Sequence, residues 1–367
     1  MPSATAAPNP GVTSAQLFAY VASSADGMIS QYRLDLDSGG LSLIATTAAG
    51  EQVSPMALSP DRSTLFAALR GQSMKSVTFS VDPSSGQLTR LGEAALPANM
   101  AYLATDRSGQ LLFGASYGGD LISIQRINAD QSVQPEPLHT LRTGLHVHSV
   151  RTDLSNRFLY AGVMGADHLL QYRLDAAGAQ LLPIAGGTVA APPSSGPRHL
   201  AFSPNGRFLY VSGETDGSVT SYGIDATSGA LTHIAHVVGI PARLDLAQGV
   251  VRDARNNDNK DDPTPRIWAA DLKVTPDGQL LYLTERTSSS VSAFRLDPDS
   301  GGLTLLDNFA VQEKQPRNIA ITPDGRWLLV TGELSEVFAS YRVNPADGSI
   351  TRTSEAPAGR NAVWIEL

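Results

Sequence analysis

The chain has 367 residues and no cysteine, so disulfides, thiolate nucleophiles and cysteine-ligated metals or iron–sulfur clusters are excluded. Its formal net charge of -8 argues against nucleic acid as a partner, because neutralising phosphates requires a basic face. Hydrophobic residues make up 42% and charged residues 17%, a globular composition that excludes general disorder.

The N-terminal segment, residues 1–15 (MPSATAAPNPGVTSA), contains no basic residue and no apolar run. We therefore expect a disordered lead-in there rather than a signal peptide. No stretch of the chain approaches the roughly 18 apolar residues that a membrane-spanning helix requires. We expect a soluble cytoplasmic protein with no membrane partner.

From residue 16 to the C-terminus, the sequence repeats one pattern of short strands. The clearest copies are FSPNGRFLYVSGETDGSVTSYGID (202–225), VTPDGQLLYLTERTSSSVSAFRLD (274–297) and ITPDGRWLLVTGELSEVFASYRVN (321–344). In each copy an apolar run meets a Pro-Asp/Asn-Gly turn, a second apolar run follows, and an alternating run comes after a polar loop. Because Pro fixes φ and Asp/Asn-Gly tolerates positive φ, the turn folds the two apolar strands against each other.

An aromatic or apolar residue near the end of the second strand recurs about every 47 residues. These positions are Tyr20, Phe66, Phe113, Tyr160, Tyr210, Tyr282 and Leu329. Seven units of about four short strands predict an all-β fold, a seven-bladed β-propeller in a single domain over residues 16–367. A six-bladed ring and a β-solenoid are the alternatives. The longer spacing between Tyr210 and Tyr282 predicts an insertion at about 239–266.

The two ends of the repeat array predict how the ring closes. The first copy begins with a second strand, LFAYVAS (17–23), and the chain ends in GRNAVWIEL (359–367), which resembles a first strand such as PRNIAIT (316–322). We expect the C-terminal strand to complete the N-terminal blade, which removes two exposed sheet edges. A closed ring makes a monomer the expected state.

Propeller geometry predicts where a site would lie. Strands of a blade run alternately up and down with the first strand at the central channel, so first-strand starts and second-strand ends share one mouth, and the Pro-Asp-Gly turns lie at the other. We expect the site at the mouth that holds the first-strand starts and second-strand ends, where loops of all blades converge. First-strand starts supply Asn99, His146, His148, Arg198, His199, Trp268, Arg317, Asn318, Arg360 and Asn361. Second-strand ends supply Arg70, Tyr117, Glu214, Glu285, Arg286 and Glu333.

The arginines and histidines of this set indicate a small anionic ligand, because arginine binds carboxylate or phosphate bidentately and keeps its charge at any pH. For any single arginine, an ion pair with a neighbouring Asp or Glu is the alternative. Glu214 follows an apolar strand and is a candidate for acid–base catalysis. A salt bridge between Glu214 and Arg198 is the alternative there.

His146 and His148 are alternate residues of one strand, so both could face a metal ion. With no third histidine nearby and no HExxH motif, we expect no metal, and we interpret His148 as a catalytic or substrate-binding residue, with a structural histidine as the alternative. The run RNNDNKDD (255–262) lacks the Gly and Glu of a calcium loop and is expected to be a solvated loop. No nucleophile elbow, Walker A loop or Rossmann fingerprint is present, so no cofactor is expected.

These segments resemble the lactonase β-propeller family, which includes propeller-type 6-phosphogluconolactonases and 3-carboxy-cis,cis-muconate lactonizing enzymes. The resemblance covers nearly the whole chain from residue 16 and is most specific in HVHSV (146–150), GPRHLAFSPNGRFLYVSGE (196–214), WAADLKVTPDGQLLYLTERTSSSVSAFRL (268–296) and QPRNIAITPDG (315–325). The WAAD segment looks most like the 6-phosphogluconolactonase branch. The chain departs from many relatives at Val163-Met164-Gly165, where Asp-Leu-Gly is frequent, and at Glu285, where Asp is frequent.

The resemblance implies a set of site residues by motif. The catalytic residues it implies are His148, Arg198, Glu214 and Arg286. Four neighbours are expected to contact the substrate, namely His146, His199, Arg317 and Glu285.

The function implied is hydrolysis of a sugar lactone, such as 6-phosphogluconolactone or a related anionic lactone, without metal or organic cofactor. His148, with Glu214, would activate water, an arginine would stabilise the oxyanion, and the other arginines would hold the anionic group. The first alternative is cycloisomerisation of a carboxymuconate in the same pocket. The second is a non-catalytic propeller that binds a ligand or partner at its mouth.

Overall fold

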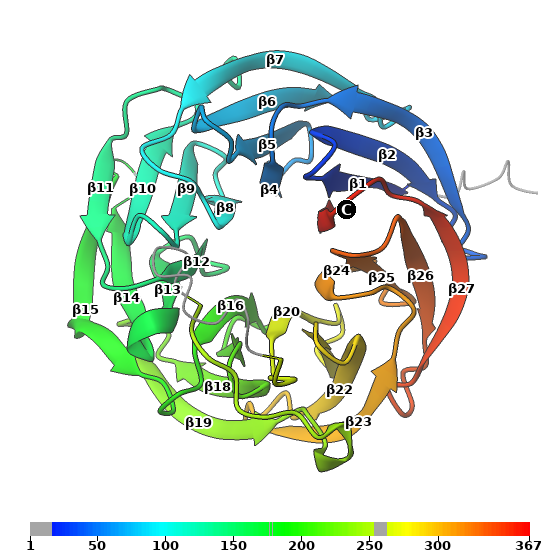
Figure 1. Cartoon of the computed structure of the whole chain (residues 1–367). Helices are drawn as coiled ribbons and strands as arrows, with labels where there is room; N and C mark the ends of the chain where they lie inside the picture. Colours follow the sequence, from blue (N-terminus) through cyan, green and yellow to red (C-terminus); the bar gives the residue numbers. More distant parts are fainter. Residues whose placement is uncertain (1–16, 176, 178, 253–262) are drawn as a thin grey trace, which may run out of the picture.

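The computed structural model describes residues 17–175, 177, 179–252 and 263–367. Seven four-stranded antiparallel sheets surround a central axis, which confirms the predicted seven-bladed β-propeller (Figure 1). Two short 3-10 helices accompany the described strands, η1 (Met164–Ala166) and η2 (Ala242–Leu244). The predicted lead-in at residues 1–15 and the run at 255–262 lie outside the described residues.

Each blade contributes one strand to each of four concentric layers. The inner strands are β28 (Ala362–Glu366), β4 (Val53–Leu58), β8 (Tyr102–Thr105), β12 (Val147–Thr152), β16 (Pro197–Phe202), β20 (Ala269–Val274) and β24 (Pro316–Ile321). The second strands are β1 (Leu17–Ser23), β5 (Thr64–Leu69), β9 (Leu111–Ser116), β13 (Phe158–Val163), β17 (Phe208–Gly213), β21 (Leu280–Glu285) and β25 (Trp327–Gly332). The third strands are β2 (Met28–Leu34), β6 (Lys75–Val81), β10 (Leu121–Arg126), β14 (His168–Asp175), β18 (Ser218–Ile224), β22 (Ser290–Leu296) and β26 (Val337–Val343). The outer strands are β3 (Leu41–Ala48), β7 (Leu88–Ala95), β11 (His139–Arg142), β15 (Gln180–Ala190), β19 (Leu231–Val238), β23 (Leu303–Ala310) and β27 (Ile350–Pro357).

The C-terminal strand closes the ring as the sequence predicts. The first blade has the strand order β28-β1-β2-β3, so it combines the last strand of the chain with the first three. β28 pairs antiparallel with β1, with Val21 opposite Ile365 and Ala22 opposite Trp364. The first strand of the array therefore has no free inner edge.

Buried apolar side chains fill the spaces between neighbouring blades. One such core combines Tyr20 and Ile29 of the first blade with Met56 and Phe79 of the second. The recurring aromatic residue also ties a blade to the next one, since Tyr160 Oη donates a hydrogen bond to the carbonyl oxygen of Gly229 at 2.7 Å. Packing between blades thus fixes the spacing of the inner strands around the channel.

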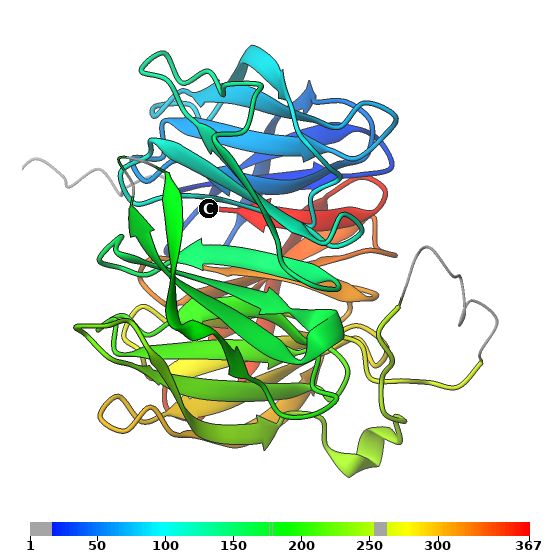
Figure 2. The same ribbon diagram turned by 90° about the vertical axis from the view of Figure 1, so that its left-hand side faces the viewer.

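Two mouths result from the common direction of the inner strands. We call the mouth at which the inner strands begin the upper mouth, and the mouth formed by the turns between inner and second strands the lower mouth. β19 ends at Val238 and β20 begins at Ala269. Of the residues between them, those of η2 project on the upper side of the ring (Figure 2). No helix within the described ranges is long and apolar enough to cross a membrane.

Candidate active site

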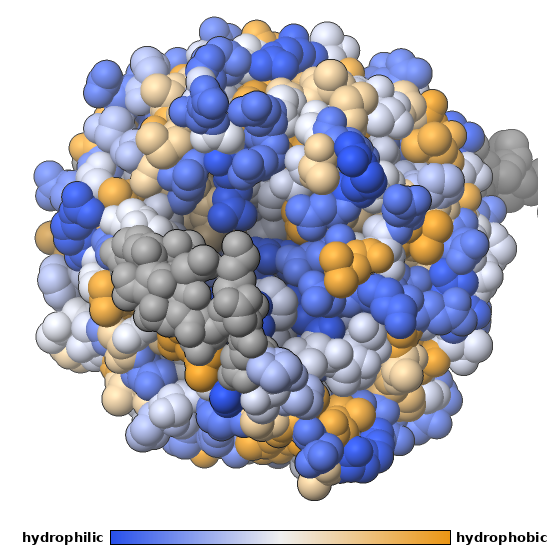
Figure 3. Space-filling model, in the orientation of Figure 1, coloured by the Kyte–Doolittle hydropathy of each residue, from blue (hydrophilic) through white to orange (hydrophobic). Residues whose placement is uncertain are grey.

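The upper mouth brings together side chains from neighbouring blades. His148 lies on β12 and Arg198 on β16, while Glu214 and Arg286 directly follow β17 and β21. Backbone hydrogen bonds hold these segments together across blades, because the amide of Ala269 donates to the carbonyl oxygen of Glu214 at 3.0 Å. A space-filling view of this face shows hydrophilic residues around a hollow at the centre of the ring (Figure 3).

Glu214 sits between two buried arginines. Its Oε2 lies 2.6 Å from Nε of Arg198 and 2.9 Å from Nη2 of Arg286, and Trp268 Nε1 donates to its Oε1 at 3.2 Å. The exposed fraction of Arg198 is 1% and that of Arg286 is 2%. The salt bridge between Glu214 and Arg198, which was the alternative expectation, is therefore present. Nη1 of Arg198 is buried and has no hydrogen-bond partner among the described residues.

Positive charge exceeds negative charge in the central cluster of this mouth. Arg317 pairs with Glu333 at its rim. Burial, together with the neighbouring charge of Arg317, lowers the pKa of Arg70 to about 10, and Nε of Arg70 has no partner among the described residues. Burial also lowers the pKa of Arg286 to about 9.

The charged groups of the central cluster at this mouth can be counted by type. The arginines that interact with one another there are Arg70, Arg198, Arg286 and Arg317, and the glutamates among them are Glu214 and Glu333. Among the described residues, this leaves a surplus of two positive charges. Because these groups lie in a largely buried cluster, the surplus is weakly screened and favours an anion there.

Two neutral histidines lie below the arginines. Burial and the charge of Arg198 hold the pKa of His148 well below 6.5, and the same two causes lower the pKa of His199 to about 3. The two ring centroids are 5.1 Å apart. Nδ1 of His148 and Nε2 of His199 are buried and have no partner among the described residues. Each ring therefore has one buried nitrogen without a hydrogen-bond partner among the described residues.

Asp271 orients His199 from below. Oδ1 of Asp271 lies 2.8 Å from Nδ1 of His199, and its Oδ2 accepts hydrogen bonds from Lys273 Nζ at 2.5 Å and Asn318 Nδ2 at 2.7 Å. Burial alone would raise the pKa of Asp271, but Lys273 and His199 hold it below its usual range. An ionised Asp271 requires the proton of neutral His199 on Nδ1, which leaves Nε2 as an acceptor.

These histidines predict how stability depends on pH. Because His148 and His199 have lowered pKa values in the fold, the unfolded chain binds more protons below about pH 6.5. The free energy of unfolding should therefore fall on acidification by about 1.4 kcal/mol per pH unit for each histidine. Urea unfolding of the wild type and of His148→Gln between about pH 7 and pH 5 tests this, and the variant should lose less stability. Parallel losses in both proteins would contradict the buried, neutral state of His148.

Two of the predicted substrate contacts, His146 and Glu285, also hold their own loops. His146 has a φ of 66°, its amide donates to Asp120 Oδ1 at 2.8 Å, and its ring stacks on Tyr117 with centroids 4.2 Å apart. The oxygens of Glu285 accept hydrogen bonds from the amides of residues 268, 287 and 288. Among the described residues, no group of three or more His, Cys, Asp or Glu side chains could hold a metal ion.

Two further residues complete the mouth, and the sequence analysis gave neither a role. The ring of Trp268 lies between the guanidinium groups of Arg252 and Arg286, each 3.6 Å from its centroid. The carbonyl oxygen of Arg252 accepts a hydrogen bond from Tyr117 Oη at 2.5 Å. Trp268 stands at a first-strand start and could have been chosen on that ground. Arg252 belongs to the insertion, where no repeat pattern predicts a contact.

A family model described as "Lactonase, 7-bladed beta-propeller" matches residues 17–367 of this chain. The 6-phosphogluconolactonase of Pectobacterium carotovorum is 34% identical over 309 residues, which are 82% of this chain and 83% of that protein. The 6-phosphogluconolactonase of Serratia proteamaculans is 30% identical over 348 residues, which are 95% of this chain and 98% of that protein.

Two solved structures share the fold. A protein of Bacteroides fragilis aligns with a TM-score of 0.83 and 22% identity over 98% of this chain and 99% of its own. The periplasmic gluconolactonase of Pseudomonas aeruginosa aligns with a TM-score of 0.79 and 23% identity over 94% of this chain and 97% of its own. At these identities the likeness concerns the fold alone.

Proposed function

This chain belongs to the seven-bladed β-propeller lactonase family, and from that membership and the upper mouth we propose that it hydrolyses a phosphorylated sugar lactone, 6-phosphogluconolactone. Curated relatives that match most of the chain are 6-phosphogluconolactonases. The observation that supports a phosphorylated substrate is the surplus of two positive charges in the central cluster of the upper mouth. A phosphate monoester carries nearly two negative charges at neutral pH, and guanidinium groups bind it bidentately.

The arginines take separate roles in this proposal. Arg70 and Arg317 hold the phosphate, since they lie at the less buried rim and Arg70 Nε has no partner among the residues that the structure describes. Arg198 stabilises the oxyanion, because its Nη1 is a buried donor without a hydrogen-bond partner among the described residues. Arg286, held by Glu214 and Trp268, keeps Arg198 in place and adds positive charge beside the carbonyl. A preorganised donor of this kind typically lowers the activation free energy by about 3 kcal/mol.

The proton moves through His148. A water molecule attacks the lactone carbonyl carbon and gives one proton to Nδ1 of His148, which forms the new C–O bond and a tetrahedral oxyanion. The bond from that carbon to the ring oxygen then breaks, and the ring oxygen takes the proton back from His148. The products are the open-chain acid and an unchanged enzyme, so the reaction needs no metal and no cofactor.

His199 and Asp271 position the attacking water. His199 Nε2 accepts the second hydrogen of the water, and Asp271 fixes the ring and its tautomer through Nδ1. This arrangement follows the general logic of a base oriented by a buried carboxylate. A bound phosphate dianion neutralises the arginine charges that lower the pKa of His148, so the substrate itself makes His148 a better base.

Measuring kcat/KM on three substrates tests the proposal. With spontaneous hydrolysis subtracted, 6-phosphogluconolactone should exceed unphosphorylated gluconolactone by at least about a hundredfold, since each charge-assisted hydrogen bond contributes about 1.5–3 kcal/mol. Equal values for the two lactones would refute a phosphate-specific site. The third substrate is 3-carboxy-cis,cis-muconate, and its conversion in place of lactone hydrolysis would favour the cycloisomerase alternative. No turnover of any of the three would favour a non-catalytic binding module.

The monomeric state and the cytoplasmic location stay predictions. The closed ring leaves no inner edge for pairing with another chain, which supports a monomer. The similar structure from Pseudomonas aeruginosa is a periplasmic protein, so membership of this fold does not decide the compartment.

A further inference from the structure

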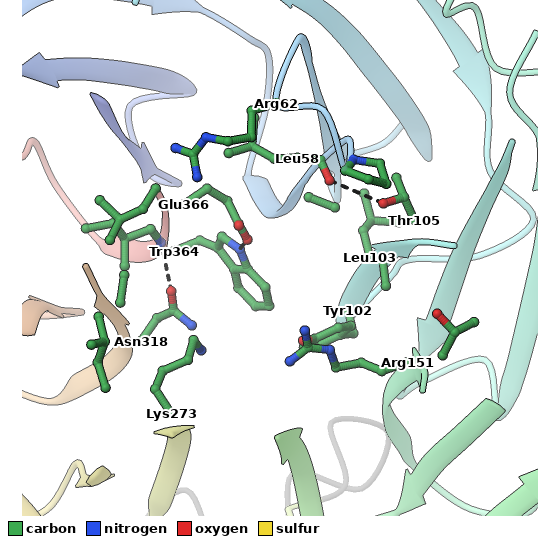
Figure 4. Close-up of a pocket in the computed structure, with 18 of the residues that line it drawn as sticks. Leu58, Arg62, Tyr102, Leu103, Thr105, Arg151, Lys273, Asn318, Trp364 and Glu366 are labelled. Atoms are coloured by element: carbon green, nitrogen blue, oxygen red, sulfur yellow. Dashed lines mark hydrogen bonds between the residues drawn. The ribbon is translucent and has the colours of Figure 1, made fainter. Parts of the chain in front are cut away.

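A second polar cavity lies at the lower mouth, away from the arginine cluster described above. Its volume is about 360 Å³. Turns and inner strands of several blades line it, among them residues 60, 62, 106, 107 and 323 of the Pro-Asp-Gly-type turns. The coloured blades follow one another in opposite senses in Figures 1 and 4, so Figure 4 views this cavity from the side opposite to Figure 1. None of the eight predicted site residues lines it.

Four basic side chains line this cavity, and they come from four different blades. They are Arg62, Arg107, Arg151 and Lys273. Arg62 and Arg107 lie in turns and form no ion pair among the described residues. Arg151 donates to the carbonyl oxygen of Leu200 at 3.2 Å, which directs its guanidinium across the opening (Figure 4). The ring thus brings four cationic groups to one opening, although they are far apart in the sequence.

The carboxylates in and beside this cavity either accept several hydrogen bonds or are buried where ionisation is unfavourable. Asp106 accepts hydrogen bonds from its own turn and from Asn156, and Asp271 is buried among its five donors. Burial raises the pKa of Glu366, and its Oε1 accepts from Trp364 Nε1 at 2.8 Å. Partial desolvation lowers the pKa of Arg62 and of Arg107, and the neighbouring charge of Arg151 lowers that of Arg107 further.

An aromatic layer separates the two mouths. Tyr102 and Trp364 line the cavity and meet edge to face, with centroids 5.4 Å apart. His199 of the upper site packs on the other side of this layer, 5.1 Å from Tyr102 and 5.9 Å from Trp364. The lower cavity is therefore a separate compartment with an apolar floor, able to contact a carbon skeleton.

We propose that the lower mouth is a second ligand site, which binds a small organic anion with at least two negative charges through Arg62, Arg107 and Arg151. The cavity volume lies in the range of small-molecule sites and exceeds what an inorganic ion needs, so the ligand is organic. Phosphate monoesters and polycarboxylates share this charge and both match guanidinium geometry. The site differs from the proposed lactone site in position and in residues, so each can fail without the other.

Isothermal titration calorimetry with glucose 6-phosphate, citrate and glucose tests the proposal. The variant Arg62→Gln/Arg107→Gln removes two cavity cations, and Arg33→Gln/Arg173→Gln removes two exposed cations that do not line the cavity. We expect glucose 6-phosphate or citrate to bind the wild type and the control variant equally, and to bind the cavity variant at least about tenfold more weakly. The tighter of the two anions identifies phosphate or carboxylate as the preferred group.

Several results would overturn the proposal. These are binding of neither anion, equal binding of glucose, unchanged affinity in the cavity variant, or the same loss in the control variant. An anion that binds only at the upper mouth would leave the affinity of the cavity variant unchanged. Near-ultraviolet circular dichroism checks the fold of both variants, and Arg107→Glu replaces the double variant if that one does not fold, since Arg107 is exposed and reversing its charge should weaken binding further.

Discussion

Replacing His148 with glutamine is expected to lower kcat/KM for 6-phosphogluconolactone by about 10²- to 10⁴-fold, the usual contribution of a general base. Glutamine fills much of the same space and keeps a polar side chain, but it cannot take a proton from water. The ring should remain folded, because Nδ1 of His148 has no hydrogen-bond partner in the part of the chain that the structure describes. Turnover with saturating lactone, corrected for spontaneous hydrolysis, gives the effect on kcat.

The matched control is His139→Gln, since His139 is exposed on the outer strand β11 and should keep full activity. His199→Gln should also lower kcat, through loss of the positioned water rather than of the proton acceptor. A His148→Gln variant with wild-type kcat/KM would remove His148 from the mechanism. If His199→Gln alone were inactive, the base would be His199 oriented by Asp271.

Replacing Glu214 with glutamine is expected to destabilise the fold by about 3–5 kcal/mol and to lower kcat at least about a hundredfold. The substitution leaves Arg198 and Arg286 buried, without their shared carboxylate and repelling each other. Glutamine still accepts the hydrogen bond from Trp268, so the substitution measures the effect of removing the negative charge alone. Urea unfolding gives the loss of stability, and initial rates at a temperature where the variant is folded give the loss of activity.

An exposed ion pair provides the comparison. Arg352 Nη2 lies 2.5 Å from Glu355 Oε2, and the exposed fraction of the Glu355 side chain is 55%. Glu355→Gln should cost less than about 1 kcal/mol and leave kcat unchanged. If Glu214→Gln were as harmless as Glu355→Gln, the buried triad of Arg198, Glu214 and Arg286 would not organise the site.

The fold could be predicted from the sequence because its signals are local and repeated. Each Pro-Asp/Asn-Gly turn marks a hairpin, and the spacing of residues such as Tyr160 and Tyr210 counts the blades. The incomplete first copy and the strand-like GRNAVWIEL end together predicted the closure through β28. No step of this argument required knowledge of contacts between distant side chains.

The site could be predicted only as a set of positions. Strand direction places His148, Arg198, Glu214 and Arg286 at one mouth, and the structure brings them together there. Their partners could not be predicted, because contacts such as that between Glu214 and Arg286 join different blades. His146 precedes β12 with a positive φ and stacks on Tyr117, which alternation along a regular strand does not anticipate.

The lower cavity could not be predicted from the sequence for a related reason. Arg62 and Arg107 stand in turns and Lys273 stands on an inner strand, all far apart in the sequence. Only the closed ring shows that they line one opening with Arg151. The role of Arg252 was equally hidden, since its contact with Trp268 depends on the path of an insertion that follows no repeat.

The most direct test of where the chemistry occurs is a crystal structure of the protein with the reaction product, 6-phosphogluconate. We predict that the product lies at the upper mouth, with its phosphate on Arg70 and Arg317 and its carboxylate within hydrogen-bond distance of His148 and Arg198. A product bound at the lower mouth alone, against Arg62 and Arg107, would contradict the assignment of the active site.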